Sequence, residues 1–495
     1  MIREHADVAI LGGGFAGSLM ALVLERIGRR PLLVERGTHP RFAIGESSTP
    51  LANLALEELS RTYGLPRLLP LAEYGPWQRT YPELAVGLKR GFSFFQHQAG
   101  QPFQPRADHA NELLVGASPA DEVGDTHWFR EDFDHFLVKE AQAAGIPYYD
   151  RTDVTAIERR DGWLLCGSRA GEPVEITATF LIDATGPSNL LARALGIDTS
   201  PVSVRTNSWT VFSHFADVDL WEDVLVELGG DVTDHPYRCD DAALHHVLDD
   251  GWIWVLRFNN GLTSAGFLLD GERRAPDASL APEAQWQSVL DRYPSIGRQF
   301  ARARPVQPWT RTGRVQRRAR RAAGEGWAML AHSAYFLDAL FSGGNAHSLL
   351  TIQRLAGMLE QHWGQPSLAS QLATYEAALL AEADFLDRLI HGCYRAFGRF
   401  DLMGAYSMYY FAGAIHSENR RRRGLASPDD PFLFSNCAAR AAVERAHEAL
   451  LGLAGASPLG VESLNEFRQR VARDIAAYNS AGLCDPSKNN MYPFV

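Results

Sequence analysis

A glycine-rich turn between two short apolar segments constrains the fold of this chain more than any other feature. DVAIL at residues 7–11 predicts a buried strand, GGGFAG follows at residues 12–17, and residues 18–27 predict a helix. PLLVE at residues 31–35 predicts the next strand. This order is that of the βαβ unit in which the pyrophosphate of a dinucleotide lies against backbone N–H groups at a helix N-terminus.

The glycines and an acidic residue have separate tasks in such a unit. Gly12 permits the tight turn, Gly14 lets the backbone approach a phosphate, and Gly17 lets the helix pack closely on the strand. Glu35 ends the second strand, where a carboxylate can accept hydrogen bonds from ribose hydroxyls. A GxGxxG motif alone is weak evidence and can be an ordinary tight turn. Its place between a strand and a helix makes dinucleotide binding the favoured interpretation.

Later segments predict returns to the same sheet. Residues 128–145 predict an amphipathic helix with a strand at 146–150, and FLIDATG at residues 180–186 predicts an apolar strand that ends in a glycine turn. Residues 327–330 and 335–344 predict a further strand, a loop and the start of a helix. The strand-like insertions between these returns are expected to pair into a second sheet over the cofactor.

We therefore predict an α/β fold with a discontinuous Rossmann-type domain, an inserted β-sheet substrate domain and a C-terminal helical region. The predicted bounds are 1–80, 120–200 and 305–365 for the cofactor domain, 81–119 and 201–304 for the substrate domain, and 366–495 for the helical region. The predicted helices beyond residue 345 include 349–362, 368–394 and about 461–478, with a Pro/Asp-rich break at 427–431.

Composition excludes several classes of protein. A net charge of −11 argues against general nucleic-acid binding, and no run approaches the ~20 apolar residues that span a bilayer. The N-terminus has no long apolar stretch behind a basic region, so we expect a soluble, cytoplasmic protein. Five scattered cysteines and sixteen histidines show no ligand spacing, which predicts neither a disulfide framework nor a metal site.

A second GxGxxG unit is absent from the sequence, so one dinucleotide must serve the whole redox function. FAD is favoured over NAD because the distant returns, which carry Arg130, Asp183 and Asp338, can contact a long cofactor along its length. The segment GWIWVLRF predicts a strand that turns Trp252, Trp254 and Leu256 to one face.

Six segments resemble, in this order, the landmarks of the flavin-dependent halogenases, within the flavoprotein monooxygenases. They are GGGFAG, HPRFAIGESSTP at residues 39–50, FREDFDHFL, FLIDATGPSNLLAR, GWIWVLRF and YFLDALFSGG. The resemblance covers roughly residues 5–355, and it is closest to members that chlorinate small free phenols.

The resemblance implies halogenation of a small electron-rich aromatic, a free phenol, with FADH2 supplied by a separate flavin reductase. Reduced flavin, dioxygen and chloride or bromide give hypohalous acid, which a dry tunnel walled by Trp252 and Trp254 carries to a lysine. VGLKRGFSFF at residues 86–95 resembles the stretch that contains this lysine, which is Lys89, beside Phe92 and Phe94. Lysine suits the role because burial lowers its pKa readily.

The fingerprint and the resemblance together predict the cofactor and halide contacts. The predicted FAD contacts are Gly12, Gly14, Ala16, Gly17, Glu35, Arg36, Arg41, Ser47, Ser48, Arg130, Asp338, Gly343 and Gly344. The predicted halide site is Ser342, Gly343 and Gly344, at a helix start.

The chain departs from the family pattern at three places. Arg257 replaces the proline of the tryptophan strand, Asp338-Ala339 replaces Asp-Pro, and Ala331-His332 replaces Gly-Asp. At the position of Arg257, an arginine can stabilise an anionic flavin, attract halide or bind an acidic substrate. Two alternatives stay open: an aromatic hydroxylase on the same fold, and a flavin-binding protein without catalysis whose helical tail docks a partner. Lys89 as a surface lysine and the indoles as plain core packing are the simpler interpretations of those residues.

Overall fold

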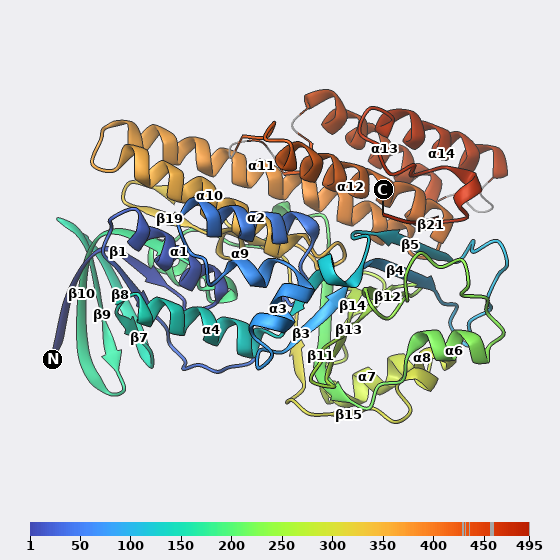
Figure 1. The fold of residues 1–495 in the computed structure, drawn as a ribbon, viewed down its shortest axis with the longest axis horizontal. Helices are drawn as coiled ribbons and strands as arrows, with labels where there is room; N and C mark the ends of the chain where they lie inside the picture. The colour runs from blue at the N-terminus through green and yellow to red at the C-terminus, as the bar shows by residue number, and fades with distance from the viewer. Residues whose placement is uncertain (428–429, 431, 435, 456–459, 495) are drawn as a thin grey trace.

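The computed structural model describes residues 1–427, 430, 432–434, 436–455 and 460–494. Its first sheet joins segments that lie far apart in the sequence (Figure 1). The central strand β1 (Ile2–Leu11) pairs in parallel with β2 (Pro31–Val34) and with β10 (Glu172–Asp183), and β10 pairs in parallel with β19 (Trp327–Met329). The predicted returns at residues 180–186 and 327–330 therefore enter the same sheet as the glycine turn.

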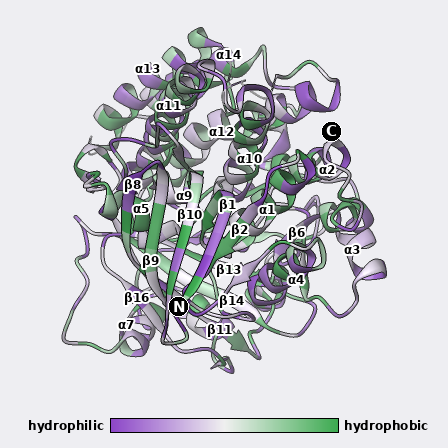
Figure 2. Cartoon of the chain, turned by 90° about the vertical axis from the view of Figure 1, so that its left-hand side faces the viewer, coloured by the Kyte–Doolittle hydropathy of each residue, from purple (hydrophilic) through white to green (hydrophobic). Residues whose placement is uncertain are grey.

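The helix after the glycine turn is enclosed on all sides. All residues from Phe15 to Leu24 of α1 (Phe15–Arg26) are buried, and α1 contacts α4 (Arg130–Ala143) and α10 (Gly343–His362). A helix that is buried all round belongs to the middle of a layered domain. Figure 2 looks onto this domain, with β8 (Thr152–Arg160), β9 (Gly162–Arg169), β10 and β1 side by side.

The two insertions pair into a second sheet, as the sequence predicts. Its strand order is β15-β11-β14-β13-β12-β4-β5-β21, with β16 beside β11. The bounds are Gly91–Gln96 for β4, Glu112–Gly116 for β5, Ser208–Ala216 for β11, Ala243–Val247 for β12, Gly251–Arg257 for β13, Thr263–Asp270 for β14, Arg304–Pro305 for β15, Thr310–Thr312 for β16 and Met491–Tyr492 for β21. Strand β21, which no sequence pattern predicts, pairs in parallel with β5 near the end of the chain.

The two faces of this sheet enter different cores. Trp252, Trp254 and Leu256 of β13 belong to the large core shared with the first sheet, whereas Ile253 and Val255 belong to a second core. That second core lies under three short helices, which are α6 (Trp221–Glu227), α7 (Pro282–Leu290) and α8 (Pro294–Gln299) (Figure 1). The alternation predicted for the tryptophan strand is confirmed.

Five helices form a layer along one side of both sheets (Figure 1). They are α10, α11 (Ser367–Ala396), α12 (Phe400–Arg422), α13 (Cys437–Ala454) and α14 (Val461–Ile475). Helix α2 (Pro50–Thr62) contacts both α10 and α12, so it joins this layer to the loop that carries ESSTP. Among the helices of the described part of the chain, none has the length and apolar character required to cross a bilayer.

Several predicted boundaries differ from the structure. Helix α4 begins at Arg130 rather than Trp128, because Trp128 ends the strand β6 (Asp125–Trp128). The strand predicted at residues 146–150 is reduced to β7 (Tyr148–Tyr149). Pro428, Asp429 and Pro431 of the predicted break lie outside the described residues. The fold class is confirmed, and the bounds of its three parts stay a prediction.

Candidate active site

The glycine turn has no room for larger side chains. Gly12 has φ +104°, and a Cβ there would lie 2.4 Å from the carbonyl oxygen of Ala184. A Cβ at Gly17 would lie 1.9 Å from the carbonyl oxygen of Gly12. Gly14 caps α1 without any side-chain hydrogen bond to the first turn of the helix. The first-turn N–H groups of α1 therefore have no side-chain cap from Gly14, and Arg130 and Arg41 lie beside this residue, which suits a phosphate.

Glu35 stands beside this turn as a buried carboxylate. It accepts hydrogen bonds from the N–H groups of Gly13 (2.9 Å) and Gly37 (2.8 Å) and from Nη2 of Arg41 (3.3 Å). Burial favours the protonated acid, but the Arg41 guanidinium and the two N–H groups outweigh it and lower the pKa of Glu35. Glu35 is thus charged at neutral pH. The next residue, Arg36, is exposed.

Arg130 connects the glycine turn to the loop that precedes α2. Its Nε and Nη2 donate to the two carboxylate oxygens of Asp134 at 2.7 and 2.8 Å, and Nη1 donates to the carbonyl oxygens of Ile44 and Gly45 at 2.9 and 3.2 Å. The guanidinium lies over the ring of Phe15, 4.8 Å from its centroid. This buried bidentate pair orients the loop toward the start of α1.

The start of α10 meets the same loop. Asn345 Nδ2 donates to the carbonyl oxygens of Gly45 (3.0 Å) and Ser47 (3.2 Å). Ser342 precedes the helix with φ +52°, a left-handed conformation that a serine adopts rarely, and it makes no side-chain cap. The predicted halide residues 342–344 and the predicted flavin loop at 45–48 are therefore adjacent, although about 300 residues separate them in the sequence.

Asp338 joins three elements just before α10. Its Oδ2 accepts hydrogen bonds from the hydroxyls of Tyr394 (2.6 Å) and Ser208 (3.1 Å), and its Oδ1 accepts one from the N–H of Leu340 (3.0 Å). Burial raises the pKa of Asp338 to about 6, against the effect of these hydrogen bonds. The carboxylate thus connects the loop to β11 and α11.

These features fit FAD. The uncapped, glycine-lined start of α1 suits a pyrophosphate, and the charged Glu35 suits a ribose. The uncapped start of α10 lies beside the loop at residues 45–48. The predicted contacts that gather at these places are Gly12, Gly14, Ala16, Gly17, Glu35, Arg41, Ser47, Ser48, Arg130, Gly343 and Gly344.

Lys89 is completely buried behind the same loop. It ends β3 (Val86–Lys89), and its Nζ donates to the carbonyl oxygen of Ser48 (2.6 Å) and to Oγ of Ser47 (3.0 Å). The ammonium lies 3.9 Å from the centroid of the Phe92 ring. Burial lowers the pKa of Lys89 to about 7, although the negative charge of Asp125 opposes the shift. Both protonation states are therefore accessible at neutral pH.

A row of aromatic rings leads across the second sheet to this lysine. The rings of Trp254 and Trp252 lie 6.0 Å apart, and His245 lies 5.1 Å from Trp252. Phe94 stacks on His245 at 4.3 Å, and Phe92 lies parallel to Phe94 at 6.3 Å. Both indoles are buried: Trp252 is 1% exposed and Trp254 is 8% exposed. The predicted tunnel residues thus lie along one face of the second sheet, and Phe92 brings that row to Lys89, which belongs to the separate strand pair of β3 and β6.

Arg257 lies on the other face. Its Nε donates to Asp240 (3.0 Å), its Nη1 donates to the carbonyl oxygen of Val218 (3.0 Å), and its Nη2 donates to that of Asp219. Strand alternation places Arg257 with Ile253, away from the tryptophans. The guanidinium of Arg257 is therefore directed away from the predicted flavin and halide sites. It connects the loop at residues 218–219 to Asp240 instead.

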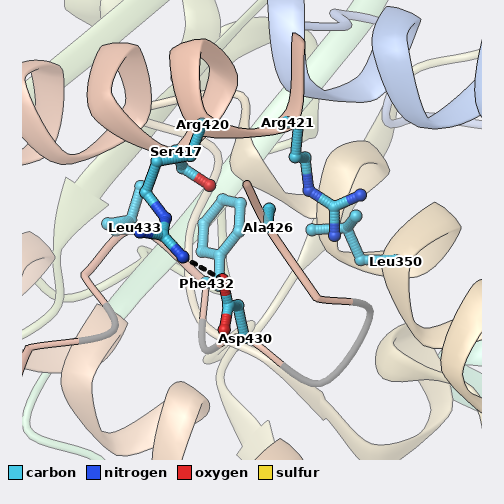
Figure 3. Close-up of a pocket in the computed structure, with 8 residues that line it drawn as sticks. All are labelled: Leu350, Ser417, Arg420, Arg421, Ala426, Asp430, Phe432 and Leu433. Atoms are coloured by element: carbon cyan, nitrogen blue, oxygen red, sulfur yellow. Dashed lines mark hydrogen bonds and ion pairs between the residues drawn. The ribbon is translucent and has the colours of Figure 1, made fainter. Parts of the chain in front are cut away.

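An apolar cavity of about 90 Å³ opens beyond Phe92. It lies between α2, β5, α12 and the end of the chain. Its lining residues are Thr49, Pro50, Leu51, Phe92, Val115, Gly116, Ala117, Tyr410, Phe411, Ala414, Ile415, Glu418, Asn419, Arg422, Ala481 and Phe494. Figure 3 shows a smaller hollow beside a different face of α12, where Arg420 pairs with Asp430 at 2.9 Å.

One cluster outside this site has metal-ligand residue types. Within the described residues, ligand atoms of His109, Glu112 and His235 lie within 4.8 Å of one another. Glu112 Oε2 lies 3.0 Å from His109 Nδ1 and 3.2 Å from His235 Nε2, and His109 Nε2 lies 3.1 Å from Asp234. All three distances are those of hydrogen bonds between ring nitrogens and carboxylates. The absence of a metal site stays a prediction.

Comparison with known proteins identifies the family. No family model matches the chain. The halogenase PltM in complex with phloroglucinol and FAD matches with a TM-score of 0.87 at 26% identity, over 98% of this chain and 99% of that chain. The monodechloroaminopyrrolnitrin halogenase PrnC of Pseudomonas fluorescens is 30% identical over 424 residues, which are 84% of this chain and 72% of that protein. The chain belongs to the flavin-dependent halogenase family.

A further relative agrees with this assignment. The tetracycline 7-halogenase of Kitasatospora aureofaciens is 29% identical over 443 residues, which are 88% of this chain and 78% of that protein. The predicted activity of the halogenase and its use of reduced FAD, dioxygen and a halide are confirmed. The comparisons favour neither the aromatic hydroxylase nor the flavoprotein without catalysis.

The far wall of the cavity in this halogenase is formed by residues that no sequence motif marks. Glu418 and Arg422 stand one helical turn apart on α12 and form an ion pair, and Phe494 closes the cavity from the end of the chain. The spacing of Glu418 and Arg422 is visible in the sequence, but such pairs are common on solvated helices. Only the packing of α12 over β4 and β5 turns this pair toward the cavity.

Proposed function

We propose that this halogenase chlorinates or brominates a small free phenol at a carbon ortho or para to its hydroxyl, with FADH2 delivered by a separate flavin reductase. The burial of Lys89 between the loop at residues 45–48 and an apolar, aromatic-lined cavity carries the proposal. The likeness to a halogenase solved with phloroglucinol and FAD supports a phenolic substrate of similar size.

We further propose that the glycine turn, Glu35, Arg41, Arg130 and the loop at residues 45–48 hold FAD, with the N–H groups of residues 342–344 near the halide. Bound reduced FAD would supply, with dioxygen and halide, the hypohalous acid for the reaction. The exposed Arg36 and the engaged Asp338 are weaker candidates for cofactor contact, because their surroundings in the protein explain them already.

Lys89 receives the oxidant on the substrate side. Its ammonium form donates a hydrogen bond to hypohalous acid, and its neutral form reacts with the acid to form an N–halogen bond and water. A pKa of about 7 makes both forms available. Trp252, Trp254, Phe92 and Phe94 keep water out of the passage, which limits loss of the mobile oxidant to side reactions.

The substrate lies in the cavity, against Phe92 and Phe411. The apolar lining suits one aromatic ring, and the small volume disfavours a substrate attached to a carrier protein. The proposal places the reaction in the cytoplasm, since the supply of FADH2 depends on a reductase in the same compartment.

Mass spectrometry tests the proposal. The halogenase is incubated with FAD, a flavin reductase, NADH, a panel of phenols, and either chloride or bromide. Products in which one hydrogen is replaced by chlorine or bromine, with the isotope pattern of that element, are expected. Lys89→Ala should abolish halogenation while flavin reoxidation by oxygen continues. Addition of one oxygen atom, or an unchanged panel, would overturn the proposed function.

A further inference from the structure

The cavity beyond Phe92 has few polar groups, and nearly all of them are occupied. Thr49 Oγ1 accepts a hydrogen bond from the N–H of Ala52, and the Tyr410 hydroxyl donates to the carbonyl oxygen of Phe341 at 2.9 Å. Asn419 Nδ2 donates to Ser480 Oγ at 3.2 Å. These groups are committed to the fold and leave the cavity with little polar capacity.

The charged groups of the lining are Arg422 and its ion-pair partner Glu418. Its Oε1 accepts a hydrogen bond from Nε of Arg422 at 2.8 Å, and its Oε2 has no hydrogen-bond partner among the described residues. The side chain lines the cavity and is only 8% exposed. An ionised carboxylate with one unpaired oxygen, turned to an apolar cavity, needs a donor to offset its desolvation. A phenolic hydroxyl is a donor of the right kind.

Burial makes Glu418 more basic than an exposed glutamate. Burial raises the pKa of Glu418, and the hydrogen bond from Arg422 opposes this shift. Asp125 interacts electrostatically with Lys89, Glu418 and Arg422. Arg422 also interacts with Glu57. Asp125 is buried, bonded to Asn53 Nδ2 at 3.0 Å, and absent from the cavity lining. Glu418 is therefore the carboxylate placed to meet a substrate.

We propose that Glu418 binds the hydroxyl of the substrate and accepts its proton during halogenation. This inference rests on the proposed function. As the O–H bond breaks, its electron pair moves into the ring, and the ortho or para carbon bonds to the halogen of the hypohalous acid. The halogen–oxygen bond breaks and hydroxide leaves. Loss of the ring hydrogen to this hydroxide forms water, and Glu418 returns its proton to the phenolate oxygen, so atoms and electrons balance.

Another face of α12 supplies a control. Arg421 Nη1 pairs there with Glu58 of α2 at 2.7 Å. Glu58 does not line the cavity, and its ion pair with Arg421 connects α2 to α12. Like Glu418, Glu58 is a glutamate that pairs with an arginine of α12. Glu58→Gln therefore removes a comparable carboxylate that does not contact the proposed substrate.

The experiment compares wild type, Glu418→Gln, Glu418→Asp and Glu58→Gln with reductase and halide, on phenols of graded acidity and on the O-methyl ether of the best phenol. Loss of a general base typically costs roughly 10²–10⁴-fold in rate. We expect a loss of this order with phenols for Glu418→Gln, partial recovery in Glu418→Asp, and no change in Glu58→Gln. More acidic phenols should recover activity in Glu418→Gln, because they need the base less. The methyl ether should react equally slowly with all four proteins.

The pH profile gives a second readout. In wild type, kcat should fall as the pH drops through the raised pKa of Glu418, and this limb should disappear in Glu418→Gln. Equal losses for phenols and the methyl ether, or an unchanged acidic limb, would overturn the inference while the proposed function stands. Absence of halogenated phenol from the wild type would instead overturn the proposed function. Thermal unfolding and flavin reoxidation rates equal to wild type confirm that each variant is folded.

Discussion

Replacing Lys89 by methionine should stabilise the halogenase at neutral pH while it abolishes halogenation. The pKa of Lys89 falls from 10.5 to about 7 on folding, because the buried ammonium loses its hydration. At about 1.4 kcal/mol for each pKa unit, the charged lysine costs the folded state about 5 kcal/mol. Methionine avoids this cost but leaves Ser48 O and Ser47 Oγ without their donor, at about 1–3 kcal/mol.

The sign of the pH dependence follows from proton binding. Between pH 7 and 10.5 the unfolded chain binds a proton at Lys89 that the folded protein does not. The unfolding free energy of wild type therefore rises by about 1.4 kcal/mol per pH unit relative to Lys89→Met in this window. The variant should be more stable by about 2–4 kcal/mol at pH 6, and the two curves should cross at alkaline pH.

Urea unfolding of both proteins from pH 6 to pH 10 measures this difference. The exposed Lys139 on α4 gives a matched control. Lys139→Met should follow wild type at every pH. A difference between wild type and Lys89→Met that stays constant across the range would refute the argument that burial neutralises Lys89.

Two further predictions concern the cofactor turn and the tryptophan strand. Gly17→Ala places a Cβ 1.9 Å from the carbonyl oxygen of Gly12 and should abolish FAD binding in a fluorescence titration, whereas Gly404→Ala, where a Cβ meets nothing within 4 Å, should bind FAD normally. Equal FAD affinity in both variants would contradict the role of the turn. Arg257→Met leaves the buried Asp240 without its cation, with only the N–H groups of Trp221 and Glu222 as backbone donors, and should lower the unfolding free energy by about 3 kcal/mol with FAD affinity unchanged. Weaker FAD binding at unchanged stability would show that Arg257 acts on the cofactor instead.

Local patterns made much of this site predictable. The glycine turn was recognisable because its requirements lie within one strand–helix–strand unit, from Gly12 to Glu35. The period of two in GWIWVLRF was sufficient to place Trp252 and Trp254 on one face, since a strand has no other way to orient its side chains. The resemblance, not the pattern, singled out Lys89, and the structure adds that it is fully buried.

Other features depended on how distant elements pack. The partners of Arg257 come from loops that no spacing in the sequence connects to β13. From the sequence, Glu418 and Arg422 are expected to form an ordinary ion pair on a helix surface. Only the packing of α12 over β4 and β5 shows that Glu418 lines the cavity. The strand β21 escaped prediction because two residues carry no periodicity and form a strand only through their partner β5.

The sequence by itself thus determined the βαβ cofactor unit, the second sheet and the side of that sheet on which the aromatic row lies, since backbone geometry imposes these periods locally. The tertiary structure alone decided what each polar group faces: the pKa of Lys89, the engagement of Arg257 and the free oxygen of Glu418. The physical reason is that desolvation and hydrogen bonding depend on everything packed around a group, and most of those atoms come from residues far away in the chain.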